Sequence, residues 1–151
     1  MPYPDKYTAN RLGLRATRNT AALPQTAQAA IFTITGGRVI ITALVGEVTT
    51  AMDATATNLK VTANPTVGAD VDIAANVAVA SDPAGTLYTL PSAFATALAK
   101  GQAVPLAANG EGVVASPGTI DLVTSASNAA GRVKWTMYWL PLDSGARVVA
   151  A

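Results

Sequence analysis

The sequence of 151 residues predicts an all-β fold, a small β-sandwich, jelly-roll-like or barrel body with one short helix and an extended N-terminal arm. Three observations lead to this prediction. Apolar and polar residues alternate with a period of two in several short segments after residue 30, as they do in half-buried strands. Turn-forming residues interrupt these segments at intervals of roughly ten residues, which is typical of antiparallel all-β domains. Residues 1–29 show no sustained period, so we expect an arm over 1–29 and one body over 30–151.

The predicted arm carries an excess of positive charge. Residues 1–20 contain four basic side chains and one acid, a net charge of +3, whereas residues 21–151 sum to −2. One interpretation is a solvated, partly disordered terminus. The other is an arm that orders on a partner, with apolar anchors and with arginines that pair with acidic groups of another subunit. The anchors would be Tyr3, Tyr7, Leu12 and Leu14, and the arginines Arg11, Arg15 and Arg18, whose spacing also fits one face of a short helix.

Three strands are predicted in the first part of the body. The first covers 31–35 and ends at a Gly-Gly pair that favours a turn. The second covers 38–50 and is apolar on both faces at its centre, so we expect it to be covered on both sides. The third covers 58–63 and stops at an Asn-Pro pair, since proline cannot donate to a sheet ladder.

Segment 70–80 is predicted as a further strand that begins with two acids. Val71 and Ile73 would point inward, and Asp70 and Asp72 outward. A calcium loop starting at Asp70 would need glycine at its sixth position and an acid at its twelfth, and the chain has neither there. We therefore expect two solvent-facing carboxylates and no metal site.

The later strands are predicted at 86–90, 120–124 and 132–140. The last has the clearest alternation: Val133, Trp135, Met137 and Trp139 face one way, and Lys134, Thr136 and Tyr138 the other. We expect the two tryptophans to lie in the core, which leaves Tyr138 as the better candidate for a surface contact.

One helix is predicted over 93–99. Ser92 can cap its start, Phe94 and Leu98 are spaced to stack on one face, and Gly101 can end it. After it, segments 103–108 and 112–116 could pair as a hairpin across the turn-forming Asn-Gly dipeptide between them.

The composition excludes several kinds of chemistry. The chain has no Cys and no His, so zinc fingers, thiol catalysis, Ser-His-Asp triads, haem ligation by histidine and iron–sulfur clusters are ruled out. The net charge of +1 provides no strong field for nucleic acid or anionic lipid. We expect no enzyme activity, no cofactor and no metal. The 32 Ala, 19 Thr and 15 Val bury little surface each, so part of the stability should come from contacts with other subunits.

Four segments carry a resemblance to a known group of proteins. They are TGGRVIITALVGEVTT, NLKVTANPTVGADVDIA, DPAGTLYTL and GRVKWTMYWLPLDSGARV, and they follow an N-terminal arm that is rich in proline and arginine. The run resembles small virion proteins encoded among the head genes of tailed bacteriophages, several of which are capsid decoration (cement or auxiliary head) proteins. The resemblance covers about residues 30–142 and lies in pattern and composition.

The resemblance implies a location and a set of partners. It implies a β-sandwich or jelly-roll subunit, clustered as a trimer or another symmetric assembly on the capsid exterior, and made in the host cytoplasm. The partners would be the major capsid protein and other copies of the chain, with no nucleic acid and no membrane. The candidate capsid-contact arm would use Tyr3, Tyr7, Arg11, Arg15 and Arg18. Residues 1–20 lack the apolar run of a secretory signal, and no apolar stretch is long enough to span a bilayer.

Two alternatives stay open. The chain could be another virion component, such as a tail-tube, tail-terminator or fibre-associated subunit, since these also use small β-rich proteins with arms. It could instead be a glycan-binding β-sandwich module, with a stacking platform drawn from Tyr88, Trp135, Tyr138 and Trp139.

Overall fold

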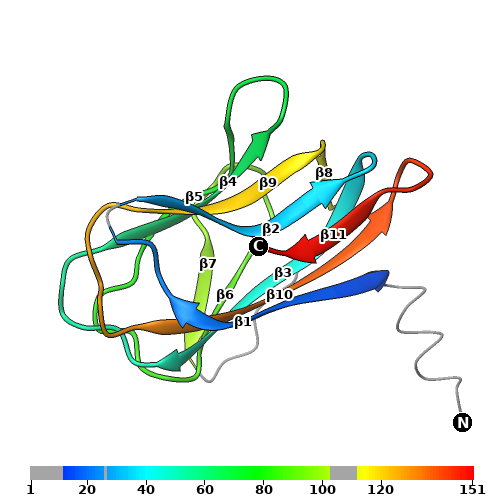
Figure 1. Cartoon of the computed structure of the whole chain (residues 1–151). Helices are drawn as coiled ribbons and strands as arrows, with labels where there is room; N and C mark the ends of the chain where they lie inside the picture. Colours follow the sequence, from blue (N-terminus) through cyan, green and yellow to red (C-terminus); the bar gives the residue numbers. More distant parts are fainter. Residues whose placement is uncertain (1–11, 26, 103–111) are drawn as a thin grey trace, which may run out of the picture.

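The fold is an antiparallel β-sandwich (Figure 1). The computed structural model describes residues 12–25, 27–102 and 112–151, and within them it contains eleven strands in two sheets. The predicted all-β fold class is therefore confirmed.

Sheet A has six strands, in the order β1-β10-β3-β6-β7, with β8 also paired to β3. Their bounds are β1 Leu14–Ala22, β3 Val39–Thr50, β6 Thr86–Thr89, β7 Ala99–Gln102, β8 Val113–Ala115 and β10 Arg132–Pro141. Strand β3 is central, with β10 on one side and both β6 and β8 on the other. This position gives β3 hydrogen-bonded neighbours along both of its edges.

Sheet B has five strands, in the order β11-β2-β9-β4-β5. Their bounds are β2 Gln28–Thr35, β4 Asn58–Pro65, β5 Val71–Ala78, β9 Gly118–Thr124 and β11 Arg147–Ala150. Along β4 the buried Leu59 and Val61 alternate with Lys60, and along β9 the buried Ile120 and Leu122 do the same around Asp121. Sheet B therefore presents one apolar face to the core and one polar face to the outside.

The two sheets meet along both lateral sides of the sandwich. On one side β1 lies beside β11, and the Arg18 Nε donates to the carbonyl oxygen of Ala151 at 3.4 Å. On the other side residues 95–98 run along β5, where Ala97 forms a parallel bridge with Ala75, and then continue into β7 of sheet A. Strands β5 and β1 thus lie at opposite sides of the sandwich.

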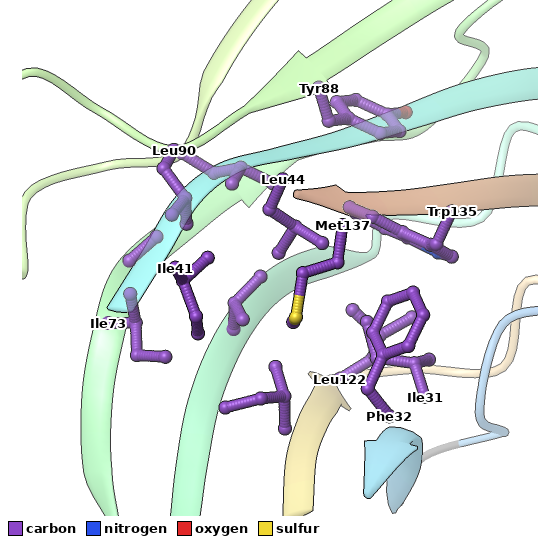
Figure 2. Close-up of a cluster of buried hydrophobic side chains, with 14 of the residues drawn as sticks. Ile31, Phe32, Ile41, Leu44, Ile73, Tyr88, Leu90, Leu122, Trp135 and Met137 are labelled. Atoms are coloured by element: carbon purple, nitrogen blue, oxygen red, sulfur yellow. The ribbon is translucent and has the colours of Figure 1, made fainter. Parts of the chain in front are cut away.

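The core between the sheets holds the largest side chains (Figure 2). Trp135 and Tyr88 are fully buried and stack with ring centroids 6.3 Å apart. Gly46 lies opposite Trp135 in the β3–β10 register, and a Cβ at Gly46 would come 2.7 Å from the indole ring. The expectation that Trp135 and Trp139 belong to the core is confirmed.

The predicted helix over 93–99 is wrong. Residues 93–96 form a turn instead, in which the Thr96 amide donates to the Ala93 carbonyl and Ala95 has a φ of 60°. The chain then extends, and the Leu98 amide donates to the Ala75 carbonyl at 3.1 Å. Hydrogen bonding to the open edge of β5 outweighs the weak helical preference of so short a segment.

The predicted arm differs from the structure in its second half. Residues Leu14–Ala22 form β1, an edge strand paired with β10, so the sandwich includes residues that the sequence analysis assigned to the arm. Ala16 is buried opposite Met137, which fixes the strand on the core. The interpretation of Arg15 and Arg18 as one helical face is therefore wrong.

Only the second strand of the predicted hairpin, segment 112–116, lies within the described residues. Segment 103–108 lies outside the described residues, and on the other side β8 pairs with β3, where Ala115 is opposite Val39.

Candidate interaction surface

A hydrogen-bonded network of polar side chains covers the outer face of sheet B. At its centre is Asp121, a carboxylate only 3% exposed. The Gln28 Nε2 donates to Asp121 Oδ2 at 2.7 Å and to Asp70 Oδ2 at 2.9 Å, and the Asn64 Nδ2 donates to Asp121 Oδ2 at 3.2 Å. Burying a carboxylate costs free energy unless donors surround it, so these amides hold Asp121 in place. Its other oxygen, Oδ1, has no hydrogen-bond partner among the described residues.

Next to this centre lies an ion pair between β4 and β5. The Lys60 Nζ lies 2.9 Å from Asp72 Oδ1, and the Thr62 hydroxyl donates to the same oxygen at 2.9 Å. The hydrogen bond from Lys60, and then that from Thr62, lower the pKa of Asp72 below its ordinary value. Asp72 and Lys60 thus neutralise each other, while Asp70 accepts a hydrogen bond from the neutral amide of Gln28.

Several of these side chains line an open hollow of about 550 Å³, and a smaller apolar hollow of about 170 Å³ lies next to it. The two hollows share Val71 and Phe94, and we call them together the sheet-B groove. Its polar half contains Gln28, Lys60, Thr62, Asp70 and Asp72, and its apolar half contains Ala63, Pro65, Ile73, Val113, Val114 and Ala115.

Three large apolar side chains of the groove are exposed to solvent. Phe94 is 57% exposed, Val71 49% and Val114 61%. Isolated exposed apolar residues are common, but three that line one hollow form a patch of the kind used for binding. The polar half of the groove also carries more acidic than basic side chains. Asp70 and Asp72 line it and Asp121 lies beneath it, whereas Lys60 is the one basic side chain in its lining.

The groove was not predicted from the sequence, for two reasons. Val71 was expected to be buried, but it is the first residue of β5 and is 49% exposed. Phe94 was expected to stack on Leu98, but the turn at 93–96 separates them, leaving Phe94 outside and Leu98 buried. Both acids of segment 70–80 lie on the outside as predicted, although they are bonded to neighbours.

The structure does not bring the described arginines of the candidate contact arm to one face. Arg15 is exposed and lies opposite Tyr138 on the outer side of sheet A, whereas Arg18 lies opposite the buried Trp135. Arg18 is instead used at the seam between β1 and β11. Tyr3, Tyr7 and Arg11 lie outside the described residues.

Most of the aromatic residues considered for a glycan platform are buried. Tyr88 and Trp135 are fully buried and Trp139 is 5% exposed, so these three rings cannot stack on a sugar in this fold. Tyr138 is half-buried on the outer face of sheet A. The exposed large aromatic among the described residues is Phe94, in the sheet-B groove.

Two other polar clusters are used to hold the fold together. The Tyr88 hydroxyl donates to Asp82 Oδ2 at 2.6 Å, and the Lys100 Nζ binds Asp82 Oδ1 at 2.9 Å. Burial, together with the bond to Asp82, raises the pKa of Tyr88. In the other cluster the fully buried Asn128 accepts from the Asp53 amide and donates to the Asp53 carbonyl.

An exposed ion pair fastens two turns at one end of the sandwich. The Arg38 guanidinium donates from two nitrogens to the two oxygens of Asp143, each at 2.9 Å. The hydrogen bonds from Arg38 lower the pKa of Asp143 to about 2. Asp143 also accepts from the Arg38 amide, so the pair joins the β2–β3 turn to the β10–β11 turn.

Among the described residues no group of three or more Asp, Glu, His or Cys side chains could hold a metal ion. In the same part of the chain, no helix has the length and apolar character needed to cross a membrane. Comparison with protein-family models, curated proteins and solved structures found no match. The surface that the fold defines is an amphipathic groove on the outside of a β-sandwich.

Proposed function

We propose that this chain is a virion structural protein, a decoration protein that binds the outside of a bacteriophage head and stabilises the shell across the joints between capsomers. One observation carries the proposal. The charged side chains of the described body are largely used to hold the sandwich together, while the sheet-B groove leaves Phe94, Val71 and Val114 open to solvent. Such a division suits a subunit that binds other proteins better than one that binds and transforms a small molecule.

The resemblance of the chain to small head proteins of tailed phages supports the same role. The abundance of Ala, Thr and Val does too, because small side chains allow flat surfaces to approach closely in an assembly. A decoration protein that binds the expanded shell better than other states stabilises that shell by mass action. Many identical copies bind one particle, so a modest affinity at each site is sufficient.

The proposal is tested by adding the purified protein back to shells that lack it. Three forms are compared: the full chain, a form without residues 1–11, and the Lys134→Ala variant, which removes an exposed basic side chain elsewhere in the body. We expect the full chain and Lys134→Ala to saturate the shell and raise its melting temperature. We expect the truncated form to bind at least about tenfold more weakly, since it lacks Tyr3, Tyr7 and Arg11.

Shells that take up none of the full chain would contradict the proposal. Equal occupancy by the truncated form would contradict the part played by the N-terminal segment alone. A tail-tube, terminator or fibre-associated subunit would instead bind tail structures, so the same add-back with purified tails separates the two virion roles.

A further inference from the structure

The exposed Phe94 of the sheet-B groove is held in place by hydrogen bonds of the neighbouring backbone. The Ala95 amide donates to the Ile73 carbonyl at 3.0 Å. The Thr96 carbonyl accepts from the Ala75 amide at 2.7 Å, so the turn around Phe94 is fixed on β5. Ala95 has a φ of 60°, a region that residues other than glycine seldom adopt. The fold thus keeps an aromatic ring in solvent at a conformational cost, and such strain often marks a site of interaction.

The charges of the groove favour a cation. Asp70 and Asp72 line it together with Lys60, and Lys60 is already paired with Asp72. Asp70 is exposed and accepts from the neutral Gln28 amide, and none of the ion pairs between described residues involves it. A lysine or arginine side chain would therefore be attracted, and an anion such as phosphate repelled. Next to that cation, the apolar half suits an aromatic or aliphatic side chain.

The N-terminal segment of the chain has this combination of side chains. Residues 1–11, MPYPDKYTANR, contain two basic side chains and one acidic side chain, and they place Lys6 directly beside Tyr7. Residues 103–111 also adjoin the groove in sequence, since they precede β8, but their one charged side chain is Glu111. Charge complementarity therefore favours residues 1–11 as the occupant.

The described chain begins close to the apolar half of the groove in the same copy. The Thr42 hydroxyl of β3 donates to the Leu12 carbonyl at 2.6 Å. Two residues along β3, Ile40 is the register partner of Val114, which lines the groove. Two residues and one strand spacing separate the backbones of Thr42 and Val114 by about 8 Å. Five extended residues span up to about 17 Å, so Tyr7 can reach the apolar half from Leu12 within one copy.

We propose that residues 1–11 bind the sheet-B groove of their own copy, with Tyr7 packed against Phe94 and Val114 and Lys6 facing Asp70. The contact belongs to the free protein and does not rest on the proposed role on a phage head. If these residues also bind a shell, they must first leave the groove, so the shell and the groove compete for one segment. The contact involves a few side chains of a tethered segment, and we expect it to open on heating before the sandwich unfolds.

Disulfide trapping tests the contact, because the chain has no cysteine of its own. In one full-length variant, Thr8→Cys is combined with Ser116→Cys, at an exposed residue that lines the apolar half of the groove. In the matched control, Thr8→Cys is combined with Ser144→Cys, in the β10–β11 turn and near the end of β10 that pairs with the start of β1. We expect the first pair to form an intramolecular disulfide at least about tenfold faster, at a rate independent of protein concentration.

Two substitutions in the groove show whether the faster reaction depends on it. Phe94→Ala removes the exposed ring, and Asp70→Asn removes the charge but keeps an acceptor for Gln28. We expect each to lower the rate of the cysteine pair at positions 8 and 116 toward that of the pair at positions 8 and 144. Val149→Ala, at an exposed residue of β11 outside the groove, should leave both rates unchanged.

Trypsin cleavage after Lys6 measures the same contact without introduced cysteines. A segment bound in the groove is cleaved only when it is released, so we expect the parent to be cleaved at least about threefold more slowly than Phe94→Ala. Val149→Ala should be cleaved at the rate of the parent.

Three results would overturn the inference. The first is equal trapping at positions 116 and 144, which would leave the groove to a partner from outside the chain. The second is trapping and cleavage at rates that the groove substitutions do not change. The third is a disulfide-linked dimer that forms in proportion to protein concentration in place of the intramolecular bond, which would assign the segment to another copy. Because neither assay contains shells, a failure here is distinct from a failure of the proposed function.

Discussion

At the scale of single residues, the burial of Trp135 requires a glycine at position 46 of the neighbouring strand. The indole is fully buried, stacks on Tyr88 and lies against the backbone of Gly46 in the next strand. Trp135 is the largest fully buried side chain of the described residues, so its contact with β3 is a central part of the core. Gly46 is not in a turn; it is required because the ring occupies the space of its side chain.

Substitution of Gly46 tests this contact. The Cβ of Gly46→Ala would meet the ring at 2.7 Å, so the ring or the strand must move. Overpacking of this kind costs about 1–3 kcal/mol of unfolding free energy, measured by urea denaturation. The matched control Glu47→Ala, at an exposed neighbour on β3, should change stability by less than about 0.5 kcal/mol.

A second substitution tests whether the loss of stability arises from the contact between residue 46 and the Trp135 ring. Trp135→Phe shortens the ring, so the double variant Gly46→Ala, Trp135→Phe should lose less stability than the sum of the two single changes. Additive losses, or an unchanged midpoint for Gly46→Ala, would contradict the described packing.

At the scale of elements, the strands that could be predicted from the sequence are those with large alternating side chains. Segment 132–140 was predicted as a strand and β10 covers Arg132–Pro141, because its bulky residues allow only one face to be buried. Strand β1 was missed because Ala16 is its one buried residue. The helix over 93–99 was predicted from local signals alone, whereas its conformation is set by β5, about twenty residues earlier in the chain.

Two truncations test the assignment of β1 to the body. Removing residues 1–11 leaves β1 intact, so we expect an unchanged melting temperature. Removing residues 1–20 takes away most of β1 and uncovers β10 next to Trp135 and Met137. A loss of about 2 kcal/mol would lower Tm by roughly 4–8 °C in a domain of this size.

The two truncations are compared by calorimetry, with circular dichroism as a check on strand content. If removal of residues 1–20 leaves Tm unchanged, β1 does not belong to the cooperative core. The division predicted from the sequence, an arm over 1–29 and a body over 30–151, would then hold.

At the scale of the whole molecule, the fold class was predictable but the interaction surface was not. Alternation and turns report on each strand separately, so they suffice for an all-β sandwich. The sheet-B groove is assembled from Gln28, Lys60, Asp72 and Phe94, which come from different parts of the chain and meet only through the strand order of sheet B and its link to residues 95–98. No local pattern reports such a juxtaposition.

The organisation of the whole molecule also explains why the composition favours assembly. Ala and Thr supply strands that pack closely without burying much surface, and three of the seven exposed large apolar side chains of the described residues lie at one groove. If the chain assembles as we propose, many weak contacts between subunits would add up to its stability.

Electron cryomicroscopy of the virus particle, with the protein marked by a bound antibody fragment, tests the central proposal most directly. The account predicts density for the protein on the outer surface of the head, in many copies at symmetry-related joints between capsomers. Density confined to the tail or its fibres, a few copies at a single vertex, or no density on the particle would contradict it.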